Sequence, residues 1–172
     1  MIGLSGIVLL AIAGWFGAAD QTALAGSTPG TGIVTLGEIP AVTVRPGDST
    51  AVVIPITIAE GYHVQANPAS DEFLIPLELE LLLEPPDSLV SWTPVYPAPG
   101  TFRLEGTTED LLTYHGSVEV KVWVYVAAHA RKGERLFSGA VSYQGCDTQR
   151  CFFPTSVPVA FQVVISEEKK GN

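Results

Sequence analysis

Cysteine, methionine and basic residues are all scarce in this sequence. Of its 172 residues, two are Cys, one is Met and nine are Lys or Arg, against eighteen Asp or Glu. The formal net charge is −9 at pH 7, and the few basic residues are scattered along the chain. Nucleic-acid binding is therefore excluded, because it needs clustered Lys and Arg along the phosphate backbone.

Metal and cofactor motifs are missing as well. The three histidines, His63, His115 and His129, show no zinc-ligand spacing relative to the cysteines. The single Met is the first residue, which leaves few soft ligands for copper. No Gly-rich phosphate loop and no Ser-His-Asp order stands out. The sequence predicts neither a metal site nor a cofactor.

Helical periodicity with capping residues is absent after the first 25 residues, and no internal repeat is visible. Apolar and polar residues alternate at Ser117–Ala127 and at Leu77–Leu83, as in half-buried strands. Further strands are expected at residues 39–44, 50–59, 89–95, 136–144 and 157–165. Short strands divided by Pro and Gly predict an all-β, antiparallel β-sandwich with a single domain at residues 38–166. A charged tail follows at 167–172.

The N-terminus is typical of an export signal. The run Ile2–Ala19 is uncharged and apolar, and Ala23-Leu24-Ala25 offers a small-x-small cleavage site. No Lys or Arg precedes the apolar run, so two interpretations of residues 1–25 stay open: a cleaved signal peptide or a short membrane anchor. Residues 26–37 are expected to be a Gly/Ser/Thr/Pro linker. Either interpretation places the domain outside the cytoplasm, where disulfides persist.

Both cysteines lie in the segment Tyr143–Pro154, which reads YQGCDTQRCFFP. Four residues separate Cys146 from Cys151, and they favour a turn, while aromatic and β-branched residues flank it. We therefore expect a hairpin that brings the two thiols within disulfide distance. Pro154 shortly after Cys151 and the absence of a Cys-x-x-Cys pair argue against a thioredoxin fold.

A disulfide that closes so short a loop contributes little stability. The chain-entropy model gives about 2 kcal/mol, compared with about 4.7 kcal/mol for a 100-residue loop. A redox role is one explanation, and a plain structural clip is the other. Arg150 next to Cys151 would favour the thiolate of that cysteine, and Asp147 next to Cys146 would disfavour the other. This asymmetry predicts that Cys151 is the nucleophile.

The motif Tyr143-Gln144-Gly145-Cys146, followed by Cys151-Phe152-Phe153-Pro154, resembles the N-terminal periplasmic domain family of the thiol:disulfide interchange protein DsbD. Gly61-Tyr62-His63 is similar to a Gly-Tyr-aromatic segment of that family. The resemblance covers roughly residues 39–165, and the cysteine motif is its specific part. The turn here has four residues between the cysteines, where the best-known members have five.

This resemblance implies an immunoglobulin-like sandwich, a periplasmic or extracytoplasmic location, and dithiol–disulfide exchange. It implies thioredoxin-like redox proteins as partners and a membrane electron donor acting in trans. It also implies that the second cysteine, Cys151, faces the partner. Tyr62, Tyr143, Asp147, Arg150 and Phe152 are expected to modulate the pair.

The resemblance further implies a cap loop that shields the disulfide and contains acidic residues and an aromatic. Asp71-Glu72-Phe73 has the expected letters, but it precedes the strand at 77–83. By chain order the cap should lie between Val95 and Tyr114, so Tyr96 and Phe102 are the expected shielding residues.

Two functions fit the sequence. In the first, Cys146 and Cys151 cycle between dithiol and disulfide and relay reducing equivalents to or from a thioredoxin-like partner, which would make the chain a thiol–disulfide oxidoreductase. In the alternative, the chain is a non-enzymatic β-sandwich binding module whose hairpin disulfide is structural.

Overall fold

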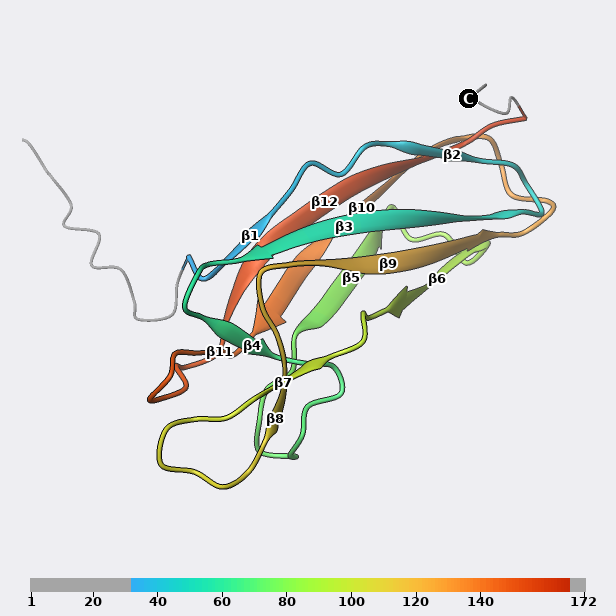
Figure 1. The fold of residues 1–172 in the computed structure, drawn as a ribbon. Coiled ribbons are helices and arrows are strands. Elements are labelled where there is room, and N and C mark those ends of the chain that lie inside the picture. Colours follow the sequence, from blue (N-terminus) through green and yellow to red (C-terminus); the bar gives the residue numbers. More distant parts are fainter. Residues whose placement is uncertain (1–31, 168–172) are drawn as a thin grey trace, which may run out of the picture.

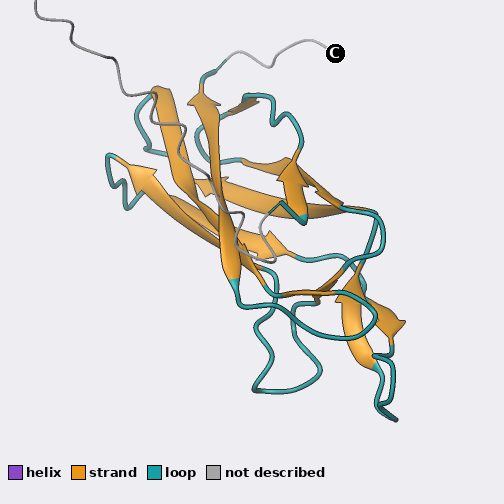
Figure 2. Cartoon of the chain, turned by 90° about the vertical axis from the view of Figure 1, so that its left-hand side faces the viewer, coloured by secondary structure: helices purple, strands orange, loops and turns teal. Residues whose placement is uncertain are grey.

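The computed structural model describes residues 32–167, which form twelve strands and no helix (Figures 1 and 2). The all-β prediction is thereby confirmed for this part of the chain. The predicted signal or anchor at residues 1–25 lies outside the described residues, as does almost all of the charged tail. None of the described segments is a helix of the length and hydropathy needed to cross a membrane.

Two four-stranded sheets make the sandwich, and their long strands run side by side in Figure 1. The first sheet has the order β1 (Val34–Leu36), β3 (Ser49–Ile58), β9 (Ser117–Val126) and β6 (Val90–Val95). The second has the order β2 (Val42–Val44), β12 (Thr155–Ile165), β10 (Gly133–Tyr143) and β5 (Glu78–Glu84). Neighbouring strands in these two sheets are antiparallel except β12 and β2, which are parallel.

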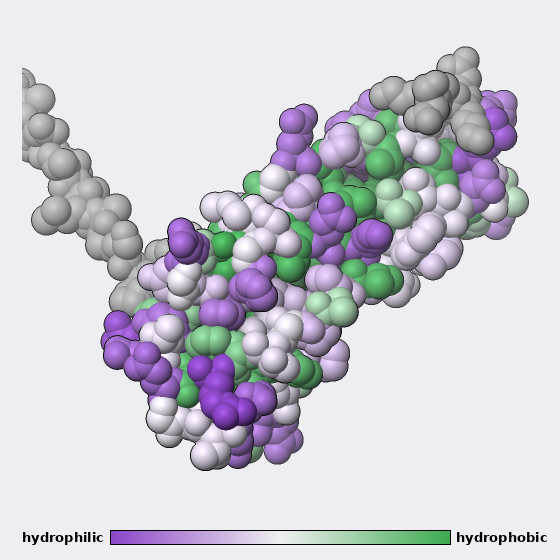
Figure 3. All heavy atoms as spheres, viewed as in Figure 1, coloured by the Kyte–Doolittle hydropathy of each residue, from purple (hydrophilic) through white to green (hydrophobic). Residues whose placement is uncertain are grey.

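The core lies between these two sheets and follows from strand alternation. On β9, Val120, Val122, Val124 and Val126 are buried, while the residues between them are exposed. The facing strands contribute a second apolar row, which includes Phe137, Phe161 and three leucines of β5, Leu79, Leu81 and Leu83. Burying one such side chain stabilises the fold by about 1.5–3 kcal/mol. On the outer surface hydrophilic and apolar residues are interspersed (Figure 3). The fold is the immunoglobulin-like β-sandwich that the sequence predicts.

A third, smaller sheet sits at one end of the sandwich (Figure 1). Its order is β11 (Gly145–Cys146), β4 (His63–Gln65), β8 (Leu111–Tyr114) and β7 (Gly100–Phe102). The chain reaches it directly from β10, because only Gln144 separates the end of β10 from β11. Cys146 therefore lies in the third sheet, directly after the strand β10 of the second sheet.

The structure contains four strands that the sequence expectations leave out, namely β1, β4, β7 and β8. β1 lies inside the stretch 26–37 that the sequence assigns to a linker, and the buried residues Ile33 and Val34 anchor it. β4 lies inside the polar stretch 61–76, for which the sequence predicts a connection and no strand, because its pattern His-Val-Gln carries one apolar residue only. Both segments are too short for periodicity to reveal them.

Candidate functional site

The two cysteines form a disulfide at the tip of the chain between β11 and β12. Its S–S distance is 2.06 Å, the χ3 dihedral is 96° and the two Cα atoms are 3.9 Å apart. The cysteines pair as an isolated antiparallel bridge, and the amide of Phe152 donates to the carbonyl of Gly145 at 2.8 Å. The expected hairpin is therefore present, although only Cys146 belongs to a regular strand.

Gly145 packs closely on Ile33 just before the first cysteine. A Cβ atom on Gly145 would lie 2.6 Å from Cδ1 of Ile33, whose side chain is buried. The bare backbone lets the cysteine strand pack directly on the residue that precedes β1. The Tyr-Gln-Gly-Cys motif thus has a steric reason at its third position.

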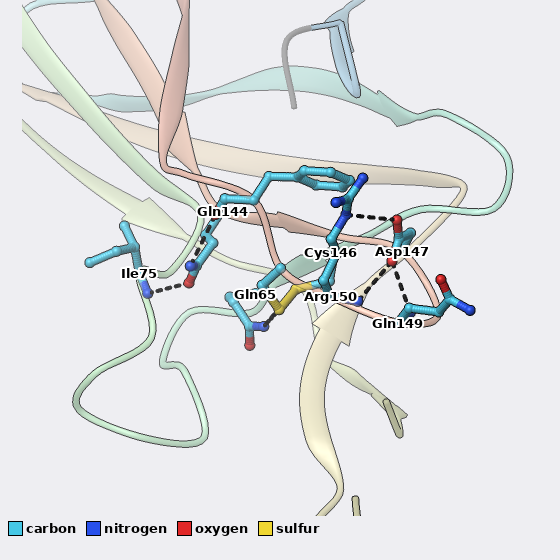
Figure 4. Close-up of a disulfide and its surroundings, with 9 residues drawn as sticks. Gln65, Ile75, Gln144, Cys146, Asp147, Gln149 and Arg150 are labelled. Carbon is cyan, nitrogen blue, oxygen red and sulfur yellow. Dashed lines mark hydrogen bonds and ion pairs between the residues drawn. A yellow bond between two sulfur atoms is a disulfide. The ribbon is translucent and has the colours of Figure 1, made fainter. Parts of the chain in front are cut away.

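Asp147 holds the turn between the cysteines together. Its Oδ1 accepts the backbone N–H groups of Gln149 and Arg150, both at 2.8 Å (Figure 4). These hydrogen bonds, and then the charge of Arg150, hold the pKa of the Asp147 carboxyl below its usual range. The Arg150 Nε lies 3.8 Å from Asp147 Oδ2, and its guanidinium lies 5.4 Å from the centre of the Phe152 ring. The carboxylate of Asp147 and the guanidinium of Arg150 lie close together and carry opposite charges. Their electrostatic effects on the neighbouring cysteines therefore oppose one another.

The two cysteines differ sharply in burial. Cys146 is fully buried, with 0% of its surface exposed, whereas Cys151 is partly exposed. Cys151 lines a surface groove of about 480 Å³ together with Gln144, Arg150, Phe152 and Phe153. Phe153 is 85% exposed, an unusual state for a large apolar side chain. An incoming group can approach the pair from the Cys151 side.

Gln65 on β4 is the residue that sequence reasoning missed. Its side chain is fully buried beneath the disulfide (Figure 4). Its Nε2 donates to the sulfur of Cys146 at 3.3 Å and lies 3.9 Å from the sulfur of Cys151. In the sequence, Gln65 is marked only by its position two residues after His63, next to the Gly-Tyr-His segment that resembles the family. Nothing in this position relates it to the cysteines.

His63, on the same strand, is the direct partner of Cys146 in the pairing of β4 with β11. The ring of Phe102 from β7 is stacked on its imidazole, with centroids 3.8 Å apart. His115 lies further out, 5.6 Å from His63 between ring centroids. Burial, followed by the charge of His115, lowers the pKa of His63. Phe102 thus lies beside the cysteine strand, in the region where a cap is expected.

Three buried polar atoms gather on this face of the third sheet without a hydrogen-bond partner. Among the described residues they are the full set of such side-chain atoms: His63 Nδ1, Gln65 Oε1 and Thr113 Oγ1. His63 pairs with Cys146, and Gln65 pairs with Thr113, so strand alternation puts all four side chains on one face. Unpaired buried polar groups are uncommon in folded proteins and call for an explanation.

Other expected residues lie around this face at different distances from it. Tyr62 packs near Phe152, with ring centroids 6.1 Å apart. Tyr143 is buried, which raises the pKa of its hydroxyl, while backbone hydrogen bonds with Val34 and Ile33 oppose that rise. Tyr62 thus packs near the residue that follows Cys151, and the hydrogen bonds of Tyr143 anchor the end of β10 to Ile33 and Val34.

Tyr96 makes its hydrogen bond to β5. Its hydroxyl accepts the backbone N–H of Leu79 at 3.0 Å, and burial raises the pKa of this phenol. It also lines a pocket with Pro55, Ile56 and Val95 at the edge of the first sheet. These contacts attach Tyr96 to β5, whereas Phe102 lies beside the cysteine strand, and the shielding role expected of both residues stays a prediction.

The two loops considered for the cap both approach the cysteine hairpin. In the β7–β8 connection, the backbone N–H of Glu105 donates to the carbonyl of Thr148 at 2.9 Å. In the β4–β5 connection, Ile75 donates its N–H to Oε1 of Gln144 at 3.1 Å (Figure 4). Phe73 of the Asp-Glu-Phe segment is 83% exposed, so its ring does not cover the disulfide.

The family model described as "Thiol:disulfide interchange protein DsbD, N-terminal" matches residues 32–162. The chain belongs to this family. The resemblance carried by the cysteine motif is thereby confirmed, over a span that contains the disulfide and all of the sandwich except the last three residues of β12. No curated protein sequence matches the chain.

Solved structures show similar β-rich domains at low identity. The N-terminal periplasmic domain of ScsB from Proteus mirabilis matches with a TM-score of 0.45 and 12% identity, over 74% of this chain and 43% of that chain. A PapD-like domain of human CEP192 matches with a TM-score of 0.37 and 8% identity, over 96% and 100%. A cohesin–dockerin complex from Clostridium thermocellum matches with a TM-score of 0.34 and 14% identity, over 77% and 99%.

Proposed function

We propose that this domain is a thiol–disulfide exchange carrier. In this proposal Cys146 and Cys151 relay reducing equivalents to or from a thioredoxin-like protein. Membership of the DsbD N-terminal family is consistent with this chemistry and with a periplasmic location. The family also implies a membrane electron donor.

The observation that carries the proposal is the unequal burial of the two sulfur-bearing residues. A purely structural clip gains nothing from having one cysteine open to a groove and the other sealed. Exchange needs one accessible sulfur, because that sulfur must be attacked while the other leaves, and Cys151 meets this need. The exposed Phe153 beside Cys151 adds an apolar surface on which a partner can dock.

The exchange proceeds in two balanced steps when the partner is the donor. A thiolate of the reduced partner attacks the sulfur of Cys151, the Cys146–Cys151 bond breaks, and the sulfur of Cys146 leaves as a thiolate. The second thiol of the partner, as thiolate, then attacks its own half of the mixed disulfide and releases Cys151. Two electrons have moved, the domain holds a dithiol and the partner holds a disulfide. The reverse sequence passes the electrons on.

The reduction potential of the disulfide tests this proposal against the alternative, a binding module with a structural bond. Equilibration of the full chain with glutathione or dithiothreitol buffers measures it. A carrier is expected at about −180 to −270 mV, in the range of known exchange proteins. A potential below about −300 mV would identify a structural disulfide and favour the binding module.

A further inference from the structure

Two backbone hydrogen bonds fix the position of Gln65 on β4. Its N–H donates to the carbonyl of Gln144 at 3.1 Å, and its carbonyl accepts the N–H of Leu77 at 2.9 Å. These bonds tie β4 to the residue before the cysteine strand and to the residue before β5. The side chain is therefore delivered to the sulfurs by a fixed backbone, which makes its amide a preorganised group.

Chemistry determines which end of the amide faces the disulfide. The sulfur atoms of a disulfide carry lone pairs and no hydrogen, so they can accept a hydrogen bond but cannot donate one. The N–H end of Gln65 is therefore the end that gains from facing Cys146, as the structure has it. The other end, Oε1, is buried and has no partner. A glutamine placed only to satisfy the fold would be expected to pair both ends.

The sulfur of Cys146 needs such a donor at one moment of the reaction. When Cys151 is attacked, negative charge develops on a sulfur whose residue is fully buried, and burial disfavours a thiolate. The nearby titratable groups do not meet this need. Burial lowers the pKa of His63, which keeps it neutral near pH 7, and Asp147 beside the cysteine is an anion that serves the turn. Arg150, the nearest cation in sequence, is paired with Asp147.

We propose that Gln65 is a catalytic residue that stabilises the leaving thiolate of Cys146. This inference rests on the proposed exchange function and deepens it. As the Cys146–Cys151 bond breaks, the electron pair goes to the Cys146 sulfur, and the Nε2–H of Gln65 donates to the resulting thiolate. A leaving thiol with a lower pKa departs faster, so the hydrogen bond speeds formation of the mixed disulfide at Cys151. In the reverse direction the same bond keeps Cys146 ionised and ready to close the ring.

The first test measures the rate at which dithiothreitol reduces the disulfide in the full chain. Gln65→Met keeps the length of the side chain and removes the N–H donor. We expect its reduction rate to fall about tenfold, because hydrogen bonds to charged groups are among the stronger ones in proteins. The exposed Gln162 on β12 offers a matched control, and Gln162→Met should react at the rate of the unmodified chain. Equal rates for both variants would overturn the proposal.

The second test measures the pKa of the Cys146 thiol. In a Cys151→Ser background the ultraviolet absorbance of the thiolate gives the pKa of Cys146, and Gln65→Met should raise this pKa by about 1. If Gln65→Met fails to fold, the native Gln65 can be followed instead. Its side-chain N–H resonance in Cys151→Ser protein should shift along the titration curve of Cys146. A resonance that stays fixed through that titration would overturn the proposal.

These readouts separate this inference from the function on which it rests. Reduction by a small dithiol needs no protein partner, so it reports on Gln65 alone. If thioredoxin-like partners exchange with the unmodified chain while Gln65→Met changes neither rate nor pKa, only the role of Gln65 falls. If the reduction potential of the disulfide is that of a structural bond, the carrier function is ruled out, and the role of Gln65 in that function is ruled out as well.

Discussion

The ring of Phe102 lies almost flat on the imidazole of His63, with centroids 3.8 Å apart and planes inclined by 20°. His63 is the residue directly opposite Cys146 in the third sheet. The stack therefore joins the β7–β8 hairpin to the strand that carries the buried cysteine. We propose that through this contact the hairpin limits access of water and small oxidants to the pair.

We predict that Phe102→Ala increases the reactivity of the reduced protein. Removal of the ring uncovers His63 and the cysteine strand, and the rate of alkylation by iodoacetamide should rise severalfold. The measurement is the decay of free thiols with time at fixed pH. Tyr96→Phe is the matched control, because it removes only a hydroxyl that accepts the Leu79 N–H. It should cost about 1 kcal/mol in stability and leave the alkylation rate unchanged.

An unchanged rate in Phe102→Ala would contradict the shielding role. The next candidate would then be the β4–β5 connection with Asp71, Glu72 and Phe73, which reaches the hairpin through Ile75 and Gln144. A faster alkylation rate in Tyr96→Phe would instead support the shielding role expected of Tyr96.

The stability of the domain should depend on His63 below neutral pH. Burial and the charge of His115 lower the pKa of His63 in the folded chain from its ordinary value near 6.5. Between the two pKa values the unfolded chain binds more protons, so the free energy of unfolding falls as the pH drops below about 6.5. Urea unfolding at pH 7.5 and 5.5 measures this loss. His63→Gln, which does not titrate, should lose less stability over that range, and an equal loss would contradict the prediction.

Much of the fold could be predicted because its long strands are strictly patterned. Ser117–Val126 alternates over ten residues, and every second residue from Val120 to Val126 is buried. Among the strands that escaped prediction, β1 and β4 have three residues each, and tertiary pairing rather than local pattern makes them strands. Each lies where the sequence suggests a flexible or polar connection.

The candidate site could be predicted only in part for a related reason. The cysteine pair and its turn are local, so spacing and turn chemistry reveal them. Gln65 reaches Cys146 across 81 positions in the sequence, and nothing local marks it. Tyr96 and Phe102 flank the same Pro-rich loop, yet strand register sends Phe102 toward His63 and places Tyr96 against Leu79. Register of this kind is a property of the assembled sheets.

The roles of the two cysteines lead to the last prediction. Cys151 lines the groove and Cys146 is fully buried, so a partner should form its mixed disulfide with Cys151. Cys146→Ser leaves the accessible thiol and should trap a thioredoxin-like partner that keeps a single active-site cysteine. Cys151→Ser leaves the buried thiol and should trap far less. Activation of the partner cysteine as a mixed disulfide with a small aromatic thiol, followed by non-reducing gel electrophoresis, counts the covalent complexes.

The burial argument replaces the charge argument that the sequence alone suggests. Arg150 and Asp147 pair with each other, so Arg150→Ala is expected to change the trapping ratio of the two variants little. A steric difference of this kind should persist at high salt, where a charge effect would be screened. Trapping at 0.05 and 0.5 M NaCl therefore separates the two causes. Equal trapping by both cysteine variants would remove the assignment of roles, and trapping by neither would favour the binding module over the carrier.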